Sequence, residues 1–139
     1  MKLIVLMEDT CGSPQCEYEH GLSIYIETQN HKILMDSGAS EKTIRNAQRL
    51  GVDLSQVDTA VLSHGHYDHS GGMLSFRQMN QEAVIYMQQS AFFDYYHNGR
   101  YIGVDKSIQK LPNIKMLDGG TVIDEEIAIF AQITGRRFW

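Results

Sequence analysis

A run of three histidines and one aspartate follows directly after an apolar segment in the middle of the chain. The segment Asp58-Thr59-Ala60-Val61-Leu62-Ser63 has the composition of a buried strand, and His64-Gly65-His66-Tyr67-Asp68-His69 begins where it ends. Imidazole and carboxylate groups are the ligands that a borderline cation such as zinc takes in proteins. Three solvated histidines would be an unusual end to a hydrophobic strand, so the pattern predicts a metal site at the carboxyl end of that strand.

The spacing within this run indicates two pairs of ligands. His64 and His66 can converge on one ion, because Gly65 removes the side-chain obstacle between them. Asp68 and His69 project from the next turn and can hold a second ion nearby. Two neighbouring ions can share a bridging hydroxide, which is a nucleophile at neutral pH. The alternative is a polar loop whose histidines are only solvated.

Short strand-like and helix-like segments alternate along the chain. Strands are expected over residues 3–7, 22–28, 32–36, 58–63, 83–87, 114–117, 120–123 and 127–133, and helices over 41–50 and 73–80, with one or two helical turns within 90–96. Ser40 is the expected N-cap of the first helix, and Gly51 follows its end. Gly119-Gly120 has the pattern of a hairpin turn. This mixture predicts an α/β (α+β) domain with a mixed sheet and helices on one face.

Composition excludes several classes of protein. Of the 139 residues, 42% are hydrophobic and 21% are charged, as in a globular domain and not a disordered chain. The net charge is −5 and there is no basic cluster other than Arg136-Arg137, which disfavours nucleic-acid binding. The apolar runs reach about five residues, whereas a membrane span takes about 20.

The two cysteines and the glycines carry weaker signals. Cys11 and Cys16 lie in one loop, and no second pair exists to complete a four-cysteine zinc site. Because the first residues do not form a signal peptide, we expect a reduced, cytoplasmic protein, with a local disulfide as the alternative. A nucleotide-binding domain is disfavoured, because neither of the usual glycine-rich phosphate motifs occurs.

Four motifs together resemble those of a known family. Val61 to Gly72 resembles the signature of the metallo-β-lactamase superfamily, and Ile33 to Gly38 resembles its earlier aspartate motif. Glu19 to Ser23 and Ile133 to Arg137 resemble the branch named for dihydropterin–ribofuranosylaminobenzene phosphate synthase, a dihydropteroate-synthase-like enzyme of methanopterin assembly. The resemblance runs over essentially the whole chain.

The resemblance implies a fold and a set of site residues. The fold would be the N-terminal half of an αββα sandwich of two sheets with helices outside. His64 and His66 correspond to ligands of the first metal, and Asp68 and His69 to ligands of the second. Asp36 corresponds to a carboxylate that steadies the ligand loop through hydrogen bonds, and Asp68 and Asp36 are the expected catalytic residues. We therefore expect Asp36 within hydrogen-bond reach of the ligand loop, the alternative being an aspartate that only forms a turn.

The resemblance also implies a cofactor and a substrate class. Two zinc ions are expected, with iron or manganese as alternatives, and the substrate would be a small molecule that is pterin-like or phosphorylated. A hydroxide activated by the metal would attack a phosphoester or an ester, or a pterin-related group would be transferred. The aromatic side chains between Phe92 and Tyr101 would form a lid that suits a flat ring, unless they serve only in packing.

This chain departs from the family after its first half. The family's second half supplies a further histidine for the first metal, a bridging aspartate and a last histidine, but no histidine follows His97 here. We therefore expect one domain over residues 1–139 that stops before the second half, with an incomplete dinuclear site and partial or absent metal occupancy. His97 lies in the lid-like insertion and not in a family ligand motif. His20 lies near the site without being a ligand, where it either contacts substrate or fixes the Gly21 turn.

Two kinds of function remain. The first is a metal-dependent hydrolase, active at least in its complete form, and the alternative is a non-catalytic half-domain that acts as an oligomerising or interaction module. The chain would be a shortened or frameshifted product, or the second half would be a separate polypeptide, or two copies would cover each other. Residues 127–132 are apolar on both faces, and Phe138 and Trp139 add apolar surface. We therefore expect a homo-oligomer that meets through its C-terminal strands.

Overall fold

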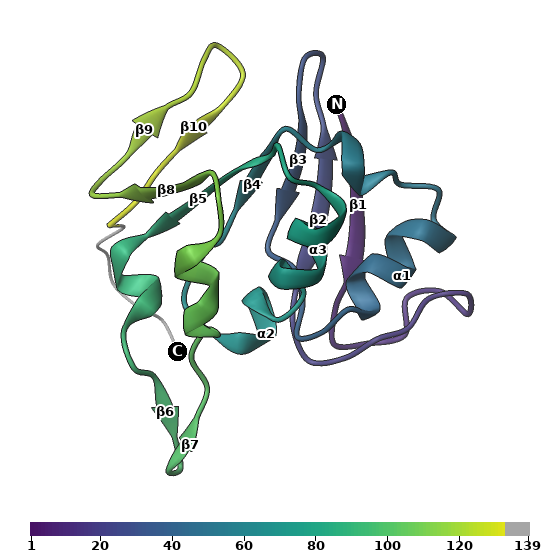
Figure 1. Cartoon of the computed structure of the whole chain (residues 1–139). Coiled ribbons are helices and arrows are strands. Elements are labelled where there is room, and N and C mark those ends of the chain that lie inside the picture. The colour runs from purple at the N-terminus through teal and green to yellow at the C-terminus, as the bar shows by residue number, and fades with distance from the viewer. Residues whose placement is uncertain (133–139) are drawn as a thin grey trace.

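Six strands form one mixed sheet in the computed structural model of the chain, which describes residues 1–132 (Figure 1). In spatial order they are β1 (Lys2–Met7), β2 (Ser23–Glu27), β3 (Lys32–Met35), β4 (Thr59–Val61), β5 (Val84–Gln88) and β8 (Ile114–Leu117). The pairs β1–β2 and β2–β3 are antiparallel, whereas β3, β4, β5 and β8 run parallel. This confirms the predicted mixed sheet. Because β3 and β4 are parallel neighbours, the chain segments that follow them emerge at the same edge of the sheet.

The helices cover one face of this sheet (Figure 1). They are α1 (Lys42–Arg49), α2 (Tyr67–Ser70) and α3 (Met73–Met79), with 3₁₀ turns η1 (Leu54–Gln56), η2 (Gln89–Phe92) and η3 (Lys106–Lys110). Leu34, Ala60, Ile85, Ile44, Ala47, Met73 and Phe76 form the centre of the buried core between sheet and helices. Each fully buried large apolar side chain contributes roughly 1.5–3 kcal/mol relative to exposure, so this layer dominates the stability of the fold. No helix within residues 1–132 is both long enough and apolar enough to cross a bilayer.

Most predicted elements occur with ends shifted by one or two residues. The first helix begins after Glu41, which occupies the N-cap position that was expected for Ser40. The Ser40 hydroxyl still accepts the Lys42 N–H at 3.2 Å and donates its own proton to Glu19. Gly51 follows the helix with φ +71°, a left-handed conformation that glycine adopts without strain. The helical turns predicted within 90–96 are a single 3₁₀ turn, η2.

The C-terminal segment differs more from the prediction. Gly119-Gly120 does not close a hairpin, because β8 pairs with β5 whereas β9 (Thr121–Val122) pairs with β10 (Ala128–Ile129) in a separate two-stranded sheet. The strand predicted over residues 127–133 is only two residues long within the described part. Phe138 and Trp139 lie outside the described residues.

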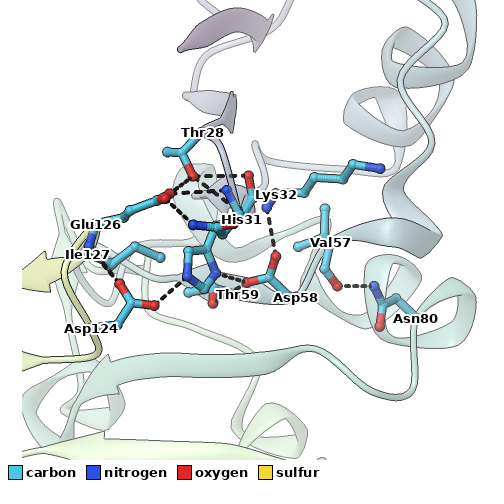
Figure 2. A network of polar contacts seen from close by, with 11 residues as sticks. Thr28, His31, Lys32, Val57, Asp58, Thr59, Asn80, Asp124, Glu126 and Ile127 are labelled. Carbon is cyan, nitrogen blue, oxygen red and sulfur yellow. Dashed lines mark hydrogen bonds and ion pairs between the residues drawn. The ribbon is translucent and has the colours of Figure 1, made fainter.

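A polar cluster fastens the β9–β10 hairpin to the large sheet (Figure 2). His31, at the turn between β2 and β3, lies between Asp58, 2.8 Å from Nδ1, and Asp124 of the hairpin, 2.5 Å from Nε2. Glu126 accepts hydrogen bonds from the Thr28 hydroxyl and from the backbone and side chain of Asn30. The hairpin is therefore held at the end of the sheet opposite to the histidine run.

These contacts predict a pH dependence of stability. Hydrogen bonds to Asp58 and Asp124 raise the pKa of His31 above its ordinary value of 6.5. The contribution of His31 to folding stability is therefore complete below pH 6.5 and is lost as the pH rises through the higher folded-state pKa. Burial acts to raise the pKa of Asp58, but the Lys32 N–H and His31 outweigh it, and the pKa of Asp124 is lowered by the Glu126 N–H and by His31. The two carboxylates therefore stabilise the fold fully above pH 3.8, and they lose that contribution to stability as the pH falls through their lowered pKa values.

We expect the hairpin contacts to be strongest between about pH 4 and pH 6.5. The substitution His31→Gln should lower the melting temperature by a few degrees at pH 5.5 and by less at pH 9. Thermal unfolding at the two pH values checks this, and NMR titration of the His31 ring gives its pKa directly. A His31 ring that titrates at or below the ordinary value would contradict the expectation.

Candidate metal centre

Three chain segments meet at the carboxyl edge of β3 and β4, and we call them the loop junction: residues 20–22, 36–39 and 68–71. Backbone hydrogen bonds join each segment to the others. The Ser37 N–H donates to the His69 carbonyl at 2.7 Å, the Gly38 N–H to Leu22 at 2.9 Å, and the Gly71 N–H to Gly38 at 2.8 Å. The histidine run is therefore anchored by the main chain and not only by its side chains.

Glycine is required where these segments touch. A Cβ atom on Gly21 would lie 2.2 Å from the Asp68 carbonyl oxygen, and one on Gly71 would lie 2.0 Å from the Ala39 carbonyl oxygen. Real Cβ atoms do not approach backbone atoms so closely, so each glycine permits a backbone contact that no other residue allows. Gly21 also has φ +140°, a conformation outside the usual range of other residues.

Asp36 lies at the centre of the junction with its carboxylate fully buried. It accepts three hydrogen bonds: from the Ser63 N–H at 2.8 Å, from the Ser63 hydroxyl at 2.7 Å and from His69 Nδ1–H at 2.7 Å. Its φ of +56° lies in the left-handed region, which aspartate tolerates better than most residues. The expected hydrogen-bond reach between Asp36 and the ligand loop is thus confirmed. The loop differs from the expectation in one respect, since Tyr67–Ser70 form the short helix α2.

Asp36 also determines which nitrogen of two histidines carries the proton. His69 donates from Nδ1, so its Nε2 remains available and lies 3.6 Å from Asp68 Oδ2. The Ser63 hydroxyl gives its proton to Asp36 and so accepts from His64 Nδ1 at 2.9 Å, which leaves His64 Nε2 available, 3.2 Å from His66 Nδ1. Hydrogen bonds of this kind fix the tautomer and orientation of histidines that bind metals.

The three rings of the run lie close together. The ring centroids are 4.6 Å apart for His64 and His66 and 4.2 Å apart for His64 and His69. Burial and the neighbouring rings of His69 and His66 lower the pKa of His64, which favours a neutral ring able to donate a lone pair. Burial alone would lower the pKa of His69 as well, but the hydrogen bond and charge of Asp36 outweigh it and raise that pKa.

These donors fit a metal in chemistry but not in number. Zinc prefers neutral imidazole nitrogens and carboxylates as ligands. The structure brings such groups together in two pairs, His64 with His66 and Asp68 with His69. Among residues 1–132, however, no group of three or more histidine, cysteine, aspartate and glutamate side chains has the geometry to hold an ion. A zinc site normally takes three or four protein ligands, and the described residues do not bring that many together.

The aromatic insertion starts beside this centre. The insertion forms a hairpin of β6 (Tyr96–His97) and β7 (Arg100–Tyr101), and His97 is exposed there, with its Nε2 3.2 Å from the Asn98 side chain. The base of the hairpin contacts the histidine run, because the rings of His66 and Tyr95 meet edge to face at 5.1 Å. The binding of a flat ring by this insertion stays a prediction.

The structure adds one residue that sequence reasoning left out of the ligand loop. His20 Nε2 lies 3.3 Å from Asp68 Oδ2, and His20 Nδ1 lies 3.1 Å from Asp9 Oδ2. The sequence signal was the Glu19-His20-Gly21 motif, but its partner Asp9 stands in a different segment with no spacing that links the two. A pocket of about 410 Å³ opens at this point, lined by Glu8, Asp9, His20, Gly21, Leu22, Asp68 and His69.

The family of the chain follows from comparisons with known proteins. A family model described as the metallo-beta-lactamase superfamily matches residues 18–134. The uncharacterized protein MJ0448 of Methanocaldococcus jannaschii is 31% identical over 91% of this chain and 52% of its own length. The 7,8-dihydropterin-6-methyl-4-(beta-D-ribofuranosyl)-aminobenzene-5'-phosphate synthase of the same organism is 32% identical over 66% of this chain and 34% of its own length.

A solved structure gives the same result. Tm1679, described as a metal-dependent hydrolase of the beta-lactamase superfamily, superposes with a TM-score of 0.77 and 28% identity over 92% of this chain and 46% of that one. The chain thus spans about half, or less, of the length of these relatives. Since the family model covers most of the sequence and the fold agrees, the protein belongs to the metallo-β-lactamase superfamily.

Proposed function

We propose that the chain carries one half of the centre of a metal-dependent hydrolase, in which His64 and His66 hold one ion and Asp68 and His69 hold a second. The observation that carries this proposal is the buried carboxylate of Asp36, which orients His69 directly and His64 through Ser63. A solvated polar loop has no need of such an arrangement. When bound, zinc, or iron or manganese in its place, supplies Lewis acidity and activates water.

The substrate class follows from the relatives and from the surroundings of the site. One relative carries the name of a synthase that acts on a dihydropterin compound with a ribofuranosyl-aminobenzene phosphate. We propose a small phosphorylated or ester substrate for this chain, with hydrolysis as the reaction and a pterin-related transfer as the alternative. Tyr95 lies against His66 and would be the first aromatic ring that such a substrate meets.

Metal uptake tests the proposal. We expect the purified chain, loaded with zinc and then dialysed, to retain well below two ions, because each pair of donors lacks ligands that a closed site needs. Replacing both His64 and His66 by alanine should lower this content further, whereas His97→Ala should leave it unchanged. Elemental analysis gives the stoichiometry, and a generic phosphodiester reports turnover. A measurable metal content that does not fall when His64 and His66 are replaced would contradict the proposed centre, and two tightly held ions in a monomer would contradict its incompleteness.

A second function is favoured by the face of the sheet that the helices leave free. Register places Val5, Ile24, Met35, Val61 and Tyr86 in one row across five strands on this face. Residues 127–131 cover only part of it and leave a pocket of about 430 Å³. We propose that a second copy of the chain, or a separate polypeptide that supplies the missing half, covers this row, so that the single domain acts as an oligomerising module.

Assembly is directly measurable. Phe130 is 79% exposed next to this face, and large exposed apolar patches on a protein surface mark interaction sites. We expect light scattering to give a mass above that of a monomer at micromolar concentration, and Phe130→Asp to shift the mass toward the monomer. Phe93→Asp is the matched control, since Phe93 is 61% exposed but belongs to the aromatic insertion. A monomer mass at every concentration would contradict self-association.

A further inference from the structure

The two cysteines of the chain lie in one surface loop, which joins β1 to β2. Cys11 is exposed and Cys16 is half-buried, and both carry free thiols. The Cys11 thiol donates to the Ser13 carbonyl oxygen at 3.7 Å, and the Cys16 N–H donates to the same oxygen at 3.0 Å. The two cysteines therefore approach one backbone atom from the two ends of a short segment.

The segment between the cysteines is already turned back on itself. The hydrogen bond from Cys16 to Ser13 closes a four-residue turn, and Pro14 stands at its second position, where its ring fixes the φ angle. Only four residues separate the two cysteines. Rotation of the two side chains, with a small shift of the turn, is what a bond of about 2.05 Å between the sulfur atoms still requires.

Hydrogen bonds fix this loop on both sides of the cysteines. After the turn, the Asn46 side chain of α1 accepts the Glu17 N–H at 2.9 Å and donates to the Glu17 carbonyl at 2.8 Å. Before the turn, Asp9 Oδ1 accepts the Gly21 N–H at 2.9 Å. These anchors limit the excursions of the loop, so the two thiols meet more often in the folded protein than in an unfolded chain of the same spacing.

Both thiols are open to a small reagent. Cys11 is exposed, and Cys16 lines a cavity of about 270 Å³ between the loop, β1 and α1. In thiol–disulfide exchange, one thiol attacks the reagent and forms a mixed disulfide, and a second thiol held nearby displaces the reagent. The exposure of the two cysteines gives the attacking role to Cys11 and the resolving role to Cys16.

We propose that Cys11 and Cys16 form a reversible thiol–disulfide modification site, whose oxidised form restrains the loop that carries Asp9. The oxidant is a small disulfide such as oxidised glutathione. The Cys11 sulfur attacks one sulfur of this disulfide and releases one glutathione thiol, and the Cys16 sulfur then attacks the Cys11 sulfur and releases the second. The two cysteines give up two electrons and two protons, which end on two glutathione thiols, and excess reduced glutathione reverses both steps.

The disulfide acts on the pocket beside the candidate metal centre through Asp9. Asp9 lies two residues before Cys11, and it lines the pocket of about 410 Å³ together with His20 and Asp68. A cross-link in the loop reduces its excursions, so the hydrogen bond from the Gly21 N–H to Asp9 opens less often. Exchange of the Gly21 amide hydrogen with solvent reports this opening directly.

The first measurement uses the full chain in a glutathione redox buffer that contains a chelator, with the products counted by mass spectrometry after an acid quench. In the folded protein we expect the internal disulfide to exceed the mixed disulfide with glutathione by about tenfold. The ratio should fall by about tenfold in concentrated urea, where the anchors of the loop are lost. Cys16→Ser should accumulate the mixed disulfide alone, and Cys11→Ser should react about tenfold more slowly, because Cys16 is half-buried.

The second measurement is hydrogen exchange at Gly21. We expect exchange in the oxidised protein to be slower than in the reduced protein by about fivefold. The variant that carries both Cys11→Ser and Cys16→Ser is the matched control, and its exchange should not respond to the redox buffer.

The two measurements separate the possible failures. An equal ratio of internal to mixed disulfide in buffer and in urea, or a mixed disulfide alone in the unsubstituted protein, would overturn the modification site. An internal disulfide that leaves the exchange of Gly21 unchanged, or a response of the double variant to the buffer, would overturn the restraint on Asp9. A dominant internal disulfide together with slower exchange at Gly21 is the result that we expect.

Discussion

Asp36→Ala is expected to lower the free energy of unfolding by about 3–5 kcal/mol, the range for removing one partner of a buried charged contact. The substitution leaves the Ser63 N–H, the Ser63 hydroxyl and His69 Nδ1–H without their acceptor. It also places alanine at φ +56°, a left-handed conformation that is strained for residues other than glycine, asparagine and aspartate. Urea denaturation followed by circular dichroism measures the change.

Two further variants make this result specific. Asp36→Asn keeps an acceptor for the Ser63 N–H and tolerates the left-handed backbone, so it should cost less stability than alanine. The NH₂ group of the asparagine would point at His69 Nδ1, so this nitrogen has to accept a hydrogen bond and the ring proton moves to Nε2. A protonated Nε2 cannot bind a metal, so metal uptake should be abolished. Asp118→Ala is the control. Asp118 is exposed, and it accepts a long hydrogen bond of 3.5 Å from the side chain of Gln132. Equal stabilities of Asp36→Ala and Asp118→Ala would show that the buried hydrogen bonds contribute nothing.

Gly71→Ala should be nearly as damaging, at about 3 kcal/mol or more, although it adds only one methyl group. The backbone of Gly71 is helical, with φ −63°, so conformation imposes no cost. The whole effect comes from a Cβ atom 2.0 Å from the Ala39 carbonyl oxygen, which forces residues 36–39 away from α2. Denaturant unfolding gives the loss of stability, and loss of metal uptake should accompany it.

Gly51→Ala provides the matched comparison for this effect. Nothing lies within 4 Å of a Cβ atom at position 51, but the φ of +71° is left-handed. The expected cost is therefore only about 1 kcal/mol, from backbone strain alone. If both glycine variants lost the same amount, the close approach at Gly71 would not be the reason for its glycine.

The fold was largely predictable because its signals are local. Apolar runs ended by polar residues marked the strands of the large sheet, and Gly51 marked the end of the first helix. The C-terminal hairpin was not predictable, because its position depends on His31 meeting Asp124, which lie far apart in sequence. A pattern of hydrophobicity carries no information about such a polar contact.

The candidate site shows the same division. The run from His64 to His69 and the upstream Asp36 motif were recognisable because the residue types and their spacing along one segment are those of metal ligands and their supporting carboxylate. The contact of His20 with Asp68 was not recognisable, since it depends on a backbone approach that only Gly21 allows. Sequence spacing reports residues on one segment, whereas this contact joins two segments through main-chain atoms.

The loop junction has a consequence for the thermodynamics of ligand capture. Ordering a residue costs roughly 1–2 kcal/mol of backbone conformational entropy, and segments without regular secondary structure usually incur that cost when their ligand arrives. Here the amides of Ser37, Gly38 and Gly71 already donate across segments. The chain thus meets this entropic cost during folding, so the side chains of the histidine run are already ordered before any ligand arrives.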